Sequence, residues 1–192
     1  MNKISKNEIS AVILAGGQGS RMGGKDKGLI EFRNLPLIAY AVNVAKDRVN
    51  EIFISANRSL EDYSKYGKVI VDDLEGFQGP LAGISKALKA CSSNYLLVLP
   101  CDSPMIDLTL IDALVERMEI SDSDICVAHD GQIMHATFAL MKSNLSESLD
   151  KFLDDGGRKM ALWYRQQRTE RVNVSSHLEL LTNLNSPEDF NF

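Results

Sequence analysis

One glycine-rich segment of the chain carries the residue types that bind phosphate. Residues 14–28 read LAGGQGSRMGGKDKG and directly follow an apolar run. Glycines let the backbone turn and let its N–H groups approach a ligand closely. Consecutive N–H donors with nearby cations form a cradle for a polyphosphate, and Arg21, Lys25 and Lys27 supply the cations. The segment therefore predicts a loop that binds a triphosphate.

Two better-known phosphate-binding loops do not fit this segment. The Walker A pattern is nearly met by Gly19-x-x-x-x-Gly24-Lys25, but Asp26 follows where Ser or Thr should hold magnesium. The dinucleotide-binding pattern G-x-G-x-x-G fails because Met22 stands at the position of its last glycine. A surface loop without a ligand is the remaining alternative, and the density of glycines and cations argues against it.

Asp102 follows another apolar run, Tyr95–Leu99, and is the main candidate for holding a metal. Open α/β sheets bind their ligands at the carboxyl ends of strands, so this carboxylate should stand beside the triphosphate. Negative groups in that arrangement repel each other unless a cation bridges them, and Mg²⁺ is therefore implied. A turn or helix cap before Pro104 is the alternative, and it does not exclude metal binding. We interpret Cys101 as a small buried residue, because the sequence places no base beside it.

Short apolar runs alternate with amphipathic segments and would position these residues. Several of the runs are almost continuously apolar, as in strands covered on both faces. This alternation predicts βαβ units and a Rossmann-like three-layer α/β fold with a mostly parallel central sheet. The predicted strands are Ser10–Ala15, Glu51–Ala56, Lys68–Val71 and Tyr95–Leu99, and the predicted helices are Pro36–Lys46, Gly79–Ala90 and Asp107–Met118.

The second half of the chain predicts an antiparallel pair that makes the sheet mixed. Asp124–Ala128 and Gln132–Met141 flank His129-Asp130-Gly131, and Asp-Gly between extended runs indicates a hairpin. No repeat or linker interrupts the pattern, which predicts a single domain over residues 1–192. The remaining predicted elements are helices at Asn144–Asp154 and Lys159–Gln167, a strand at Arg171–Ser175, and a capping-box helix start at Ser186-Pro187-Glu188-Asp189.

The motif L-A-G-G-x-x-x-R-M-G-G-x-D-K-G resembles the signature of the molybdenum cofactor guanylyltransferases, the MobA family. That family lies within the nucleotidyltransferases related to sugar-nucleotide pyrophosphorylases, and the G-x-D-K-G part narrows the resemblance to MobA. One departure is His135-Ala136, where the family often has His-Pro. Further matching segments are Ser55-Ala56-Asn57-Arg58, Gly79-Pro80-Leu81-Ala82-Gly83, Pro100-Cys101-Asp102, His129-Asp130-Gly131, Gly156-Gly157-Arg158 and Asn183–Asp189.

The resemblance implies a nucleotide-diphospho-sugar transferase-like fold and a defined reaction. GMP passes from GTP to the terminal phosphate of molybdopterin (Mo-molybdopterin), pyrophosphate is released, and the molybdopterin guanine dinucleotide cofactor is formed. Both substrates are anions, so the task is to neutralise charge and align the attack, without a covalent nucleophile. The implied catalytic residues are Arg21, Lys27 and Asp102, with Asp102 as the Mg²⁺ ligand.

The resemblance also implies residues that bind the two substrates. Asp72 would accept hydrogen bonds from guanine N1–H and its exocyclic amine, and such a site discriminates strongly against other bases. The 79–83 loop would come close to the base or ribose. The histidines are interpreted as turn or surface residues. The implied nucleotide-binding residues are Leu14, Ala15, Gly16, Gly17, Lys27, Asp72 and Asp102, and the candidate substrate contacts are Asn57, Gly79, Arg158, Asn183 and Asn185.

Composition limits the partners and the compartment. The 192 residues hold 21 Lys and Arg against 26 Asp and Glu, a net charge of −5, which disfavours nucleic acid as a partner. The apolar runs are too short to cross a membrane. The three cysteines lack C-x-x-C spacing, which fits a reduced, cytoplasmic setting. We expect a monomer or weak oligomer. Because the implied reaction belongs to molybdenum cofactor biosynthesis, we also expect docking to molybdoenzyme chaperones.

Two other functions stay open from the sequence. One is a related nucleotidyltransferase that uses CTP or a sugar-phosphate acceptor. The other is a nucleotide-binding module that has lost its chemistry, and the presence of Arg21, Lys27 and Asp102 together argues against it.

Overall fold

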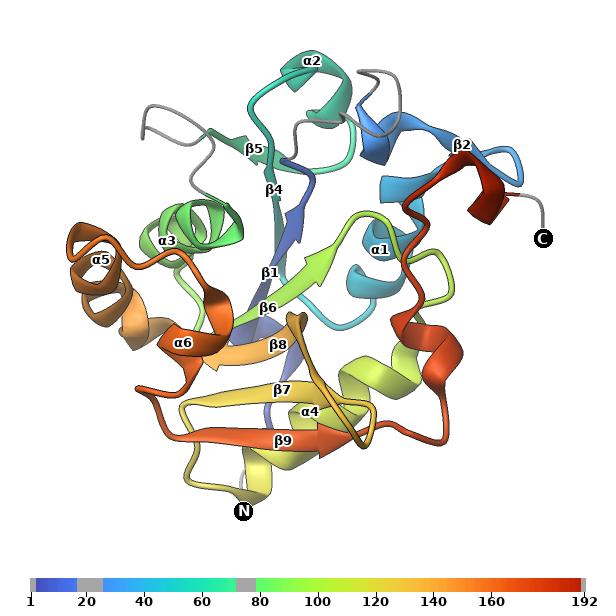
Figure 1. The fold of residues 1–192 in the computed structure, drawn as a ribbon. Coiled ribbons are helices and arrows are strands. Elements are labelled where there is room, and N and C mark those ends of the chain that lie inside the picture. The colour runs from blue at the N-terminus through green and yellow to red at the C-terminus, as the bar shows by residue number, and fades with distance from the viewer. Residues whose placement is uncertain (1–2, 17–25, 72–78, 191–192) are drawn as a thin grey trace.

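A seven-stranded sheet forms the centre of the molecule, in the order β5-β4-β1-β6-β8-β7-β9 (Figure 1). The structure is a computed structural model that describes residues 3–16, 26–71 and 79–190. Strand β8 runs antiparallel to β6 and β7, and the other pairs are parallel, which confirms a mixed, mostly parallel sheet. The strands are β1 Ile9–Leu14, β4 Glu51–Ser55, β5 Lys68–Ile70, β6 Tyr95–Pro100, β7 Ile125–His129, β8 Met134–Lys142 and β9 Thr169–Asn173.

Helices cover both faces of the sheet, which confirms the three-layer α/β fold (Figure 1). Helices α1 and α4 pack on one face, and α3, α5 and α6 pack on the other. Helix α4 begins where the sequence predicted, because the Asp107 carboxylate accepts a hydrogen bond from the Thr109 N–H at 2.8 Å. The helices are α1 Leu37–Ala45, α2 Leu60–Tyr63, α3 Pro80–Ala90, α4 Leu108–Ile120, α5 Ser146–Asp154 and α6 Met160–Tyr164.

The central strand β1 illustrates why its sequence is continuously apolar. Ala11 and Ile13 belong to the core under α1 and α4, whereas Val12 belongs to the core under α3 and α5. All three side chains are fully buried. A strand covered on both faces needs apolar residues at successive positions instead of alternating ones.

Several predicted boundaries were wrong. Helix α6 stops at Tyr164 instead of Gln167, and the last strand is Thr169–Asn173 instead of Arg171–Ser175 because its pairing with β7 fixes its register. The segment after Ser186 forms only a 3₁₀ turn, Pro187–Phe190. The sequence did not predict α2 or the small hairpin of β2 (Glu31–Phe32) and β3 (Leu35–Pro36).

No helix in the described part of the chain combines the length and the apolar character needed to cross a membrane.

Candidate active site

The candidate site lies at the carboxyl ends of β1, β4 and β6. The chain runs from β1 outward to β4 and β5, and then returns through α3 to β6 on the other side of β1. The point where the strand order reverses is where open α/β sheets bind ligands. Leu14, Ala15 and Gly16 stand at the end of β1, Asn57 follows β4, and Asp102 follows β6.

Backbone hydrogen bonds hold these three strand ends together. The Ala15 N–H donates to the Ser55 carbonyl at 2.9 Å, and the Cys101 N–H donates to the Leu14 carbonyl at 3.2 Å. The residue after each strand is therefore fixed relative to its neighbours, which is the rigidity that a binding site on loops requires.

Lys27, Asp102 and Asn185 meet at this edge although they come from three distant parts of the chain. The Lys27 Nζ forms an ion pair with Asp102 Oδ2 and donates to Asn185 Oδ1 at 2.7 Å. The side chains of Lys27 and Asp102 are 21% and 15% exposed, so both are accessible but partly desolvated. The Leu184 N–H donates to the Asp102 carbonyl at 2.9 Å and fixes the C-terminal segment beside β6.

The sequence did not predict a hydrogen bond that fixes the residue before Lys27. The hydroxyl of Tyr63, at the end of α2, donates to Asp26 Oδ1 at 2.6 Å, and Asp26 directly precedes Lys27. Burial is the main cause that raises the pKa of Tyr63, and the hydrogen bond to Asp26 raises it further. The hydroxyl therefore stays protonated and donates. A Cβ at Gly28 would lie 2.6 Å from the Tyr63 hydroxyl, which requires glycine at that position. No local signal in the sequence joins α2 to the glycine-rich segment.

The two candidate asparagines of the C-terminal segment are held by their own surroundings. Asn183 Oδ1 accepts a hydrogen bond from the Ser103 hydroxyl at 2.6 Å, next to Asp102. The Asp189 carboxylate accepts from the N–H groups of Asn185 at 2.7 Å and Ser186 at 2.8 Å. These bonds lower the pKa of Asp189, with the Asn185 N–H contributing most. The predicted capping arrangement therefore closes a short turn and directs Asn185 to Lys27.

Gly79 and Arg158 lie next to each other. Gly79 has a φ of +78°, which favours glycine, and directly precedes Pro80 at the start of α3. A Cβ at Gly79 would lie 4.0 Å from the Arg158 carbonyl oxygen. The Arg158 guanidinium donates to the carbonyls of Leu153 at 2.8 Å and Gly157 at 2.7 Å, and so caps the end of α5.

Gly83 has a packing role that the sequence did not indicate, and the expected approach of the 79–83 segment to the base or ribose stays a prediction. A Cβ at this position would lie 2.0 Å from Ser55 Oγ. Gly83 thus lets helix α3 pack directly against the end of β4. Gly17, Arg21, Lys25 and Asp72 lie outside the described residues, and their assigned roles stay predictions.

The sequence interpretation can also be compared with the structure for Cys101 and His135. Cys101 is buried, and burial raises the pKa of its thiol, which agrees with its interpretation as a packing residue. His135 does not stand alone: its Nε2 lies 2.8 Å from Asp130 Oδ2. Asp130 also accepts from the N–H groups of Gln132 and Ile133, and His135 is the main cause of its lowered pKa.

The donors at this edge fit a magnesium ion that is shared with a nucleotide. Within the described ranges, no group of three or more His, Cys, Asp or Glu side chains could hold a metal by itself. Mg²⁺ typically binds through one or two carboxylates together with substrate phosphates and water. Asp102, accessible at the end of β6, supplies one such carboxylate.

Comparisons with known proteins agree with this geometry. Residues 11–171 match the family model described as MobA-like NTP transferase domain. The chain is 43% identical over 185 residues to the molybdenum cofactor guanylyltransferase of Vibrio atlanticus, covering 95% of this chain and 93% of that protein. It is 40% identical over 182 residues to the protein of that name from Shewanella sediminis, covering 94% and 93%.

Solved structures share the fold. Molybdopterin-guanine dinucleotide biosynthesis protein A from Archaeoglobus fulgidus aligns with a TM-score of 0.79 at 19% identity, covering 94% of each chain. The bifunctional IspDF from Campylobacter jejuni aligns with a TM-score of 0.74 at 18% identity, covering 95% of this chain and 53% of that one.

Proposed function

Because the chain belongs to the MobA-like NTP transferase family, we propose that it is a molybdenum cofactor guanylyltransferase that transfers GMP from GTP to molybdopterin. The proposal depends mainly on the ion pair between Lys27 and Asp102, which lies where the strand order of the sheet reverses. The relatives of that name match along more than nine-tenths of the chain, so the proposal concerns the whole protein.

The proposed reaction joins two anions. A terminal phosphate oxygen of molybdopterin forms a bond to the α-phosphorus of GTP, the bond from that phosphorus to the bridging oxygen of the β-phosphate breaks, and pyrophosphate leaves with the electron pair. When bound, Mg²⁺ supplies positive charge and orients phosphate oxygens. Catalysis then depends on cations positioned before the substrates arrive.

Lys27 is suited to this role. A lysine ammonium has three N–H donors, and with described residues it uses two of them, for Asp102 and Asn185. The third can donate to an oxygen of the α-phosphate, where negative charge increases during the transfer. We expect Arg21 and the N–H groups of Gly16 and Gly17 to bind the departing pyrophosphate.

The other assignments of this proposal follow from the family. Leu14 and Ala15 would line the nucleotide site, Asp72 would select guanine, and Asn57 and Gly79 would lie on the nucleoside side. Asn183 and Asn185 would stay next to the phosphates. Cytoplasmic location, a monomeric or weakly oligomeric state and docking to molybdoenzyme chaperones stay predictions.

Substrate choice is the direct test. The purified protein is incubated with Mg²⁺, molybdopterin and each nucleoside triphosphate in turn, and release of pyrophosphate is measured. We expect turnover with GTP. Turnover with CTP alone, or with a sugar phosphate as acceptor, would assign the protein to a related nucleotidyltransferase.

A pair of variants tests the role of Asp102. Asp102→Asn should lower turnover at least about 100-fold, as removal of an electrostatic group at the reacting centre typically does. Asp155→Asn, at an exposed position after α5, is the matched control and should leave turnover unchanged. Binding of GTP without turnover in the parent protein would instead identify a nucleotide-binding module.

A further inference from the structure

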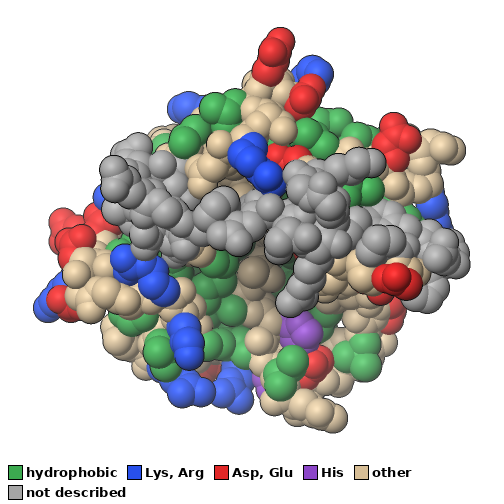
Figure 2. Space-filling view, turned by 45° about the horizontal axis from the view of Figure 1, so that its top comes forward, with side chains coloured by type: hydrophobic (Ala, Val, Ile, Leu, Met, Phe, Trp, Pro, Cys, Tyr) green, Lys and Arg blue, Asp and Glu red, His purple; other side chains and the backbone are tan. Residues whose placement is uncertain are grey.

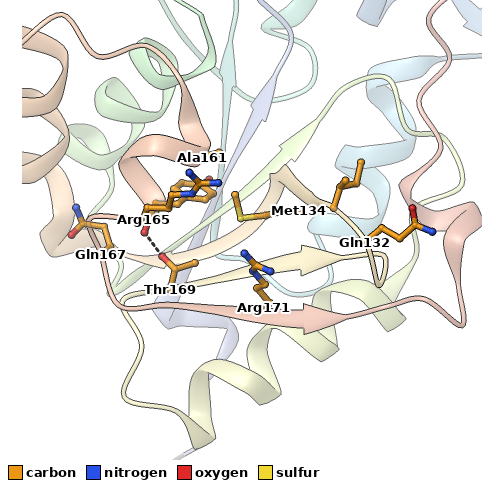
Figure 3. A pocket seen from close by; sticks show the side chains of 9 residues that line it. Gln132, Met134, Ala161, Arg165, Gln167, Thr169 and Arg171 are labelled. Atoms are coloured by element: carbon orange, nitrogen blue, oxygen red, sulfur yellow. Dashed lines mark hydrogen bonds between the residues drawn. The ribbon is translucent and has the colours of Figure 1, made fainter.

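A second feature of the molecule is a pocket between α6, the start of β8 and β9. Its volume is about 440 Å³, and its lining includes Gln132, Met134, Tyr164, Arg165, Thr169 and Arg171. Figure 3 shows Arg171 projecting from β9 and Arg165 from the end of α6, with Met134 between them. None of these residues is among the substrate contacts of the proposed function.

The walls of this pocket are held in place by hydrogen bonds. The Tyr164 hydroxyl donates to the Ala136 carbonyl at 2.9 Å and joins α6 to β8. The Thr169 hydroxyl donates to the Tyr164 carbonyl at 2.6 Å and joins β9 to α6 (Figure 3). The pocket is thus a fixed depression rather than a gap between loose segments.

The two arginines of the pocket are exposed and uncompensated. In the part of the chain that the structure describes, neither Arg165 nor Arg171 forms an ion pair or hydrogen bond through its guanidinium. Arg168, between them in the sequence, is instead neutralised by Asp122 and by Asp124, the latter at 2.7 Å. A chain with net charge −5 thus holds, at one pocket, two guanidinium groups that no described carboxylate pairs with. Figure 2 shows Lys and Arg side chains gathered at the lower left of the face that it draws.

One end of the pocket lies at the sheet edge that holds Lys27 and Asp102. In the antiparallel pair of β6 and β8, Val98 lies opposite Ala139, so the first residues of β8 lie at the edge where β6 ends. Met134 is at the start of β8, and Asp102 follows the end of β6. The end of the pocket formed by Met134 is therefore at the edge that holds the ion pair, whereas Thr169, which pairs with Ile125 at the start of β7, lies toward the opposite edge.

We propose that this pocket binds the pterin and dithiolene end of molybdopterin, while the phosphate end reacts beside Lys27 and Asp102. This inference rests on the proposed function. A guanidinium stacks on flat rings and forms paired hydrogen bonds with anionic groups, which suits a planar pterin that carries dithiolene sulfurs. Met134 supplies an adaptable apolar contact between the two cations. Arg165 and Arg171 thus determine which acceptor is used.

Charge-removing substitutions test the assignment. Arg165→Gln, Arg171→Gln and the double variant keep polar side chains at exposed positions, so the fold should be unaffected. Arg117→Gln is the matched control, because Arg117 is exposed on α4, which covers the other face of the sheet. We expect the double variant to raise the KM for molybdopterin at least about tenfold, with unchanged KM for GTP and unchanged Tm; the control should match the parent.

Direct binding separates this inference from the proposed function. Molybdopterin binding without GTP is measured anaerobically, with a pterin that lacks the terminal phosphate as competitor. The competitor should displace molybdopterin from the parent and bind poorly to the double variant. Parent-like binding and KM in the double variant, or an equal rise in the KM for GTP, would overturn the pocket assignment. If the parent binds molybdopterin through these arginines but does not turn over, the proposed function fails and the pocket assignment stands.

Discussion

Replacing Gly83 by alanine tests whether this glycine is required for helix α3 to pack against the end of β4. Within an exposed helix, Gly→Ala normally stabilises by about 1 kcal/mol. Here the added Cβ would lie 2.0 Å from Ser55 Oγ and 2.8 Å from Ser55 Cβ, and Gly83 is buried inside α3. Both contacts are far below van der Waals separation, so α3 must move away from β4.

The expected magnitude follows from setting these two effects against each other. Overpacking a buried position typically costs about 1–3 kcal/mol, and contacts this short place Gly83→Ala at or above the upper end. After the helix gain is subtracted, a net loss of about 2 kcal/mol in the free energy of unfolding is expected. For a chain of this size that lowers the Tm by roughly 4–8 °C.

The assay is thermal and urea unfolding of the parent and four variants: Gly83→Ala, Gly16→Ala, Ser55→Gly, and the double variant of Ser55 and Gly83. Gly16→Ala is the control, because among the described residues its Cβ would meet only the Ser55 carbonyl oxygen, at an ordinary 3.6 Å. Ser55→Gly removes both atoms that clash, so in that background Gly83→Ala should cost at least about 1 kcal/mol less. The reasoning is refuted if Gly83→Ala is as stable as the parent, or if its cost is the same in both backgrounds.

Three further predictions concern the site and the pH dependence of stability. Lys27→Met should lower kcat at least about 100-fold in the pyrophosphate assay with little change in Tm, and equal activity would exclude Lys27 from the reaction. Tyr63→Phe keeps the ring but removes the hydrogen bond to Asp26, so unfolding should show a loss of about 1–3 kcal/mol. Hydrogen bonds from Arg168, opposed by burial, lower the pKa of Asp124 to about 2 in the folded protein. The stabilisation by this carboxylate is therefore fully present above its pKa of about 4 in the unfolded chain, and it is lost as the pH falls toward 2. Asp124→Asn should therefore be less stable than the parent at pH 7, and urea midpoints should converge below about pH 4; a constant difference would contradict the assignment.

The sequence predicted the central elements because burial leaves a strong pattern in them. The strands β1, β4, β5 and β6 lie within one residue of their predicted starts and ends. Strand β9 has no such pattern, because Glu170 and Arg171 are exposed at the sheet edge and only the pairing with β7 determines its register. Helix α2 is a single turn of four residues, too short to show helical periodicity.

The candidate site was predictable as a set of residues but not as an arrangement. Strand ends and the glycine-rich segment pointed to Asp102 and Lys27, yet their contact joins positions 75 residues apart. Contacts such as Tyr63 with Asp26 depend on how α2 packs, and neither side chain alone carries a signal for the other. The packing of Gly83 against Ser55 was likewise not predictable, because it depends on where α3 lies against the end of β4.

Charge explains why the proposed chemistry must be confined to one edge of the sheet. A chain of net charge −5 repels both a triphosphate and a phosphorylated acceptor at long range, so binding depends on local cations. Lys27 is already engaged by Asp102, and one lysine cannot balance two polyanionic substrates. The balance has to come from the predicted Arg21 and Mg²⁺ on the nucleotide side, and from Arg165 and Arg171 on the acceptor side. The division of cations between these two sides gives each substrate its own binding determinant, so the two KM values should respond to different arginines.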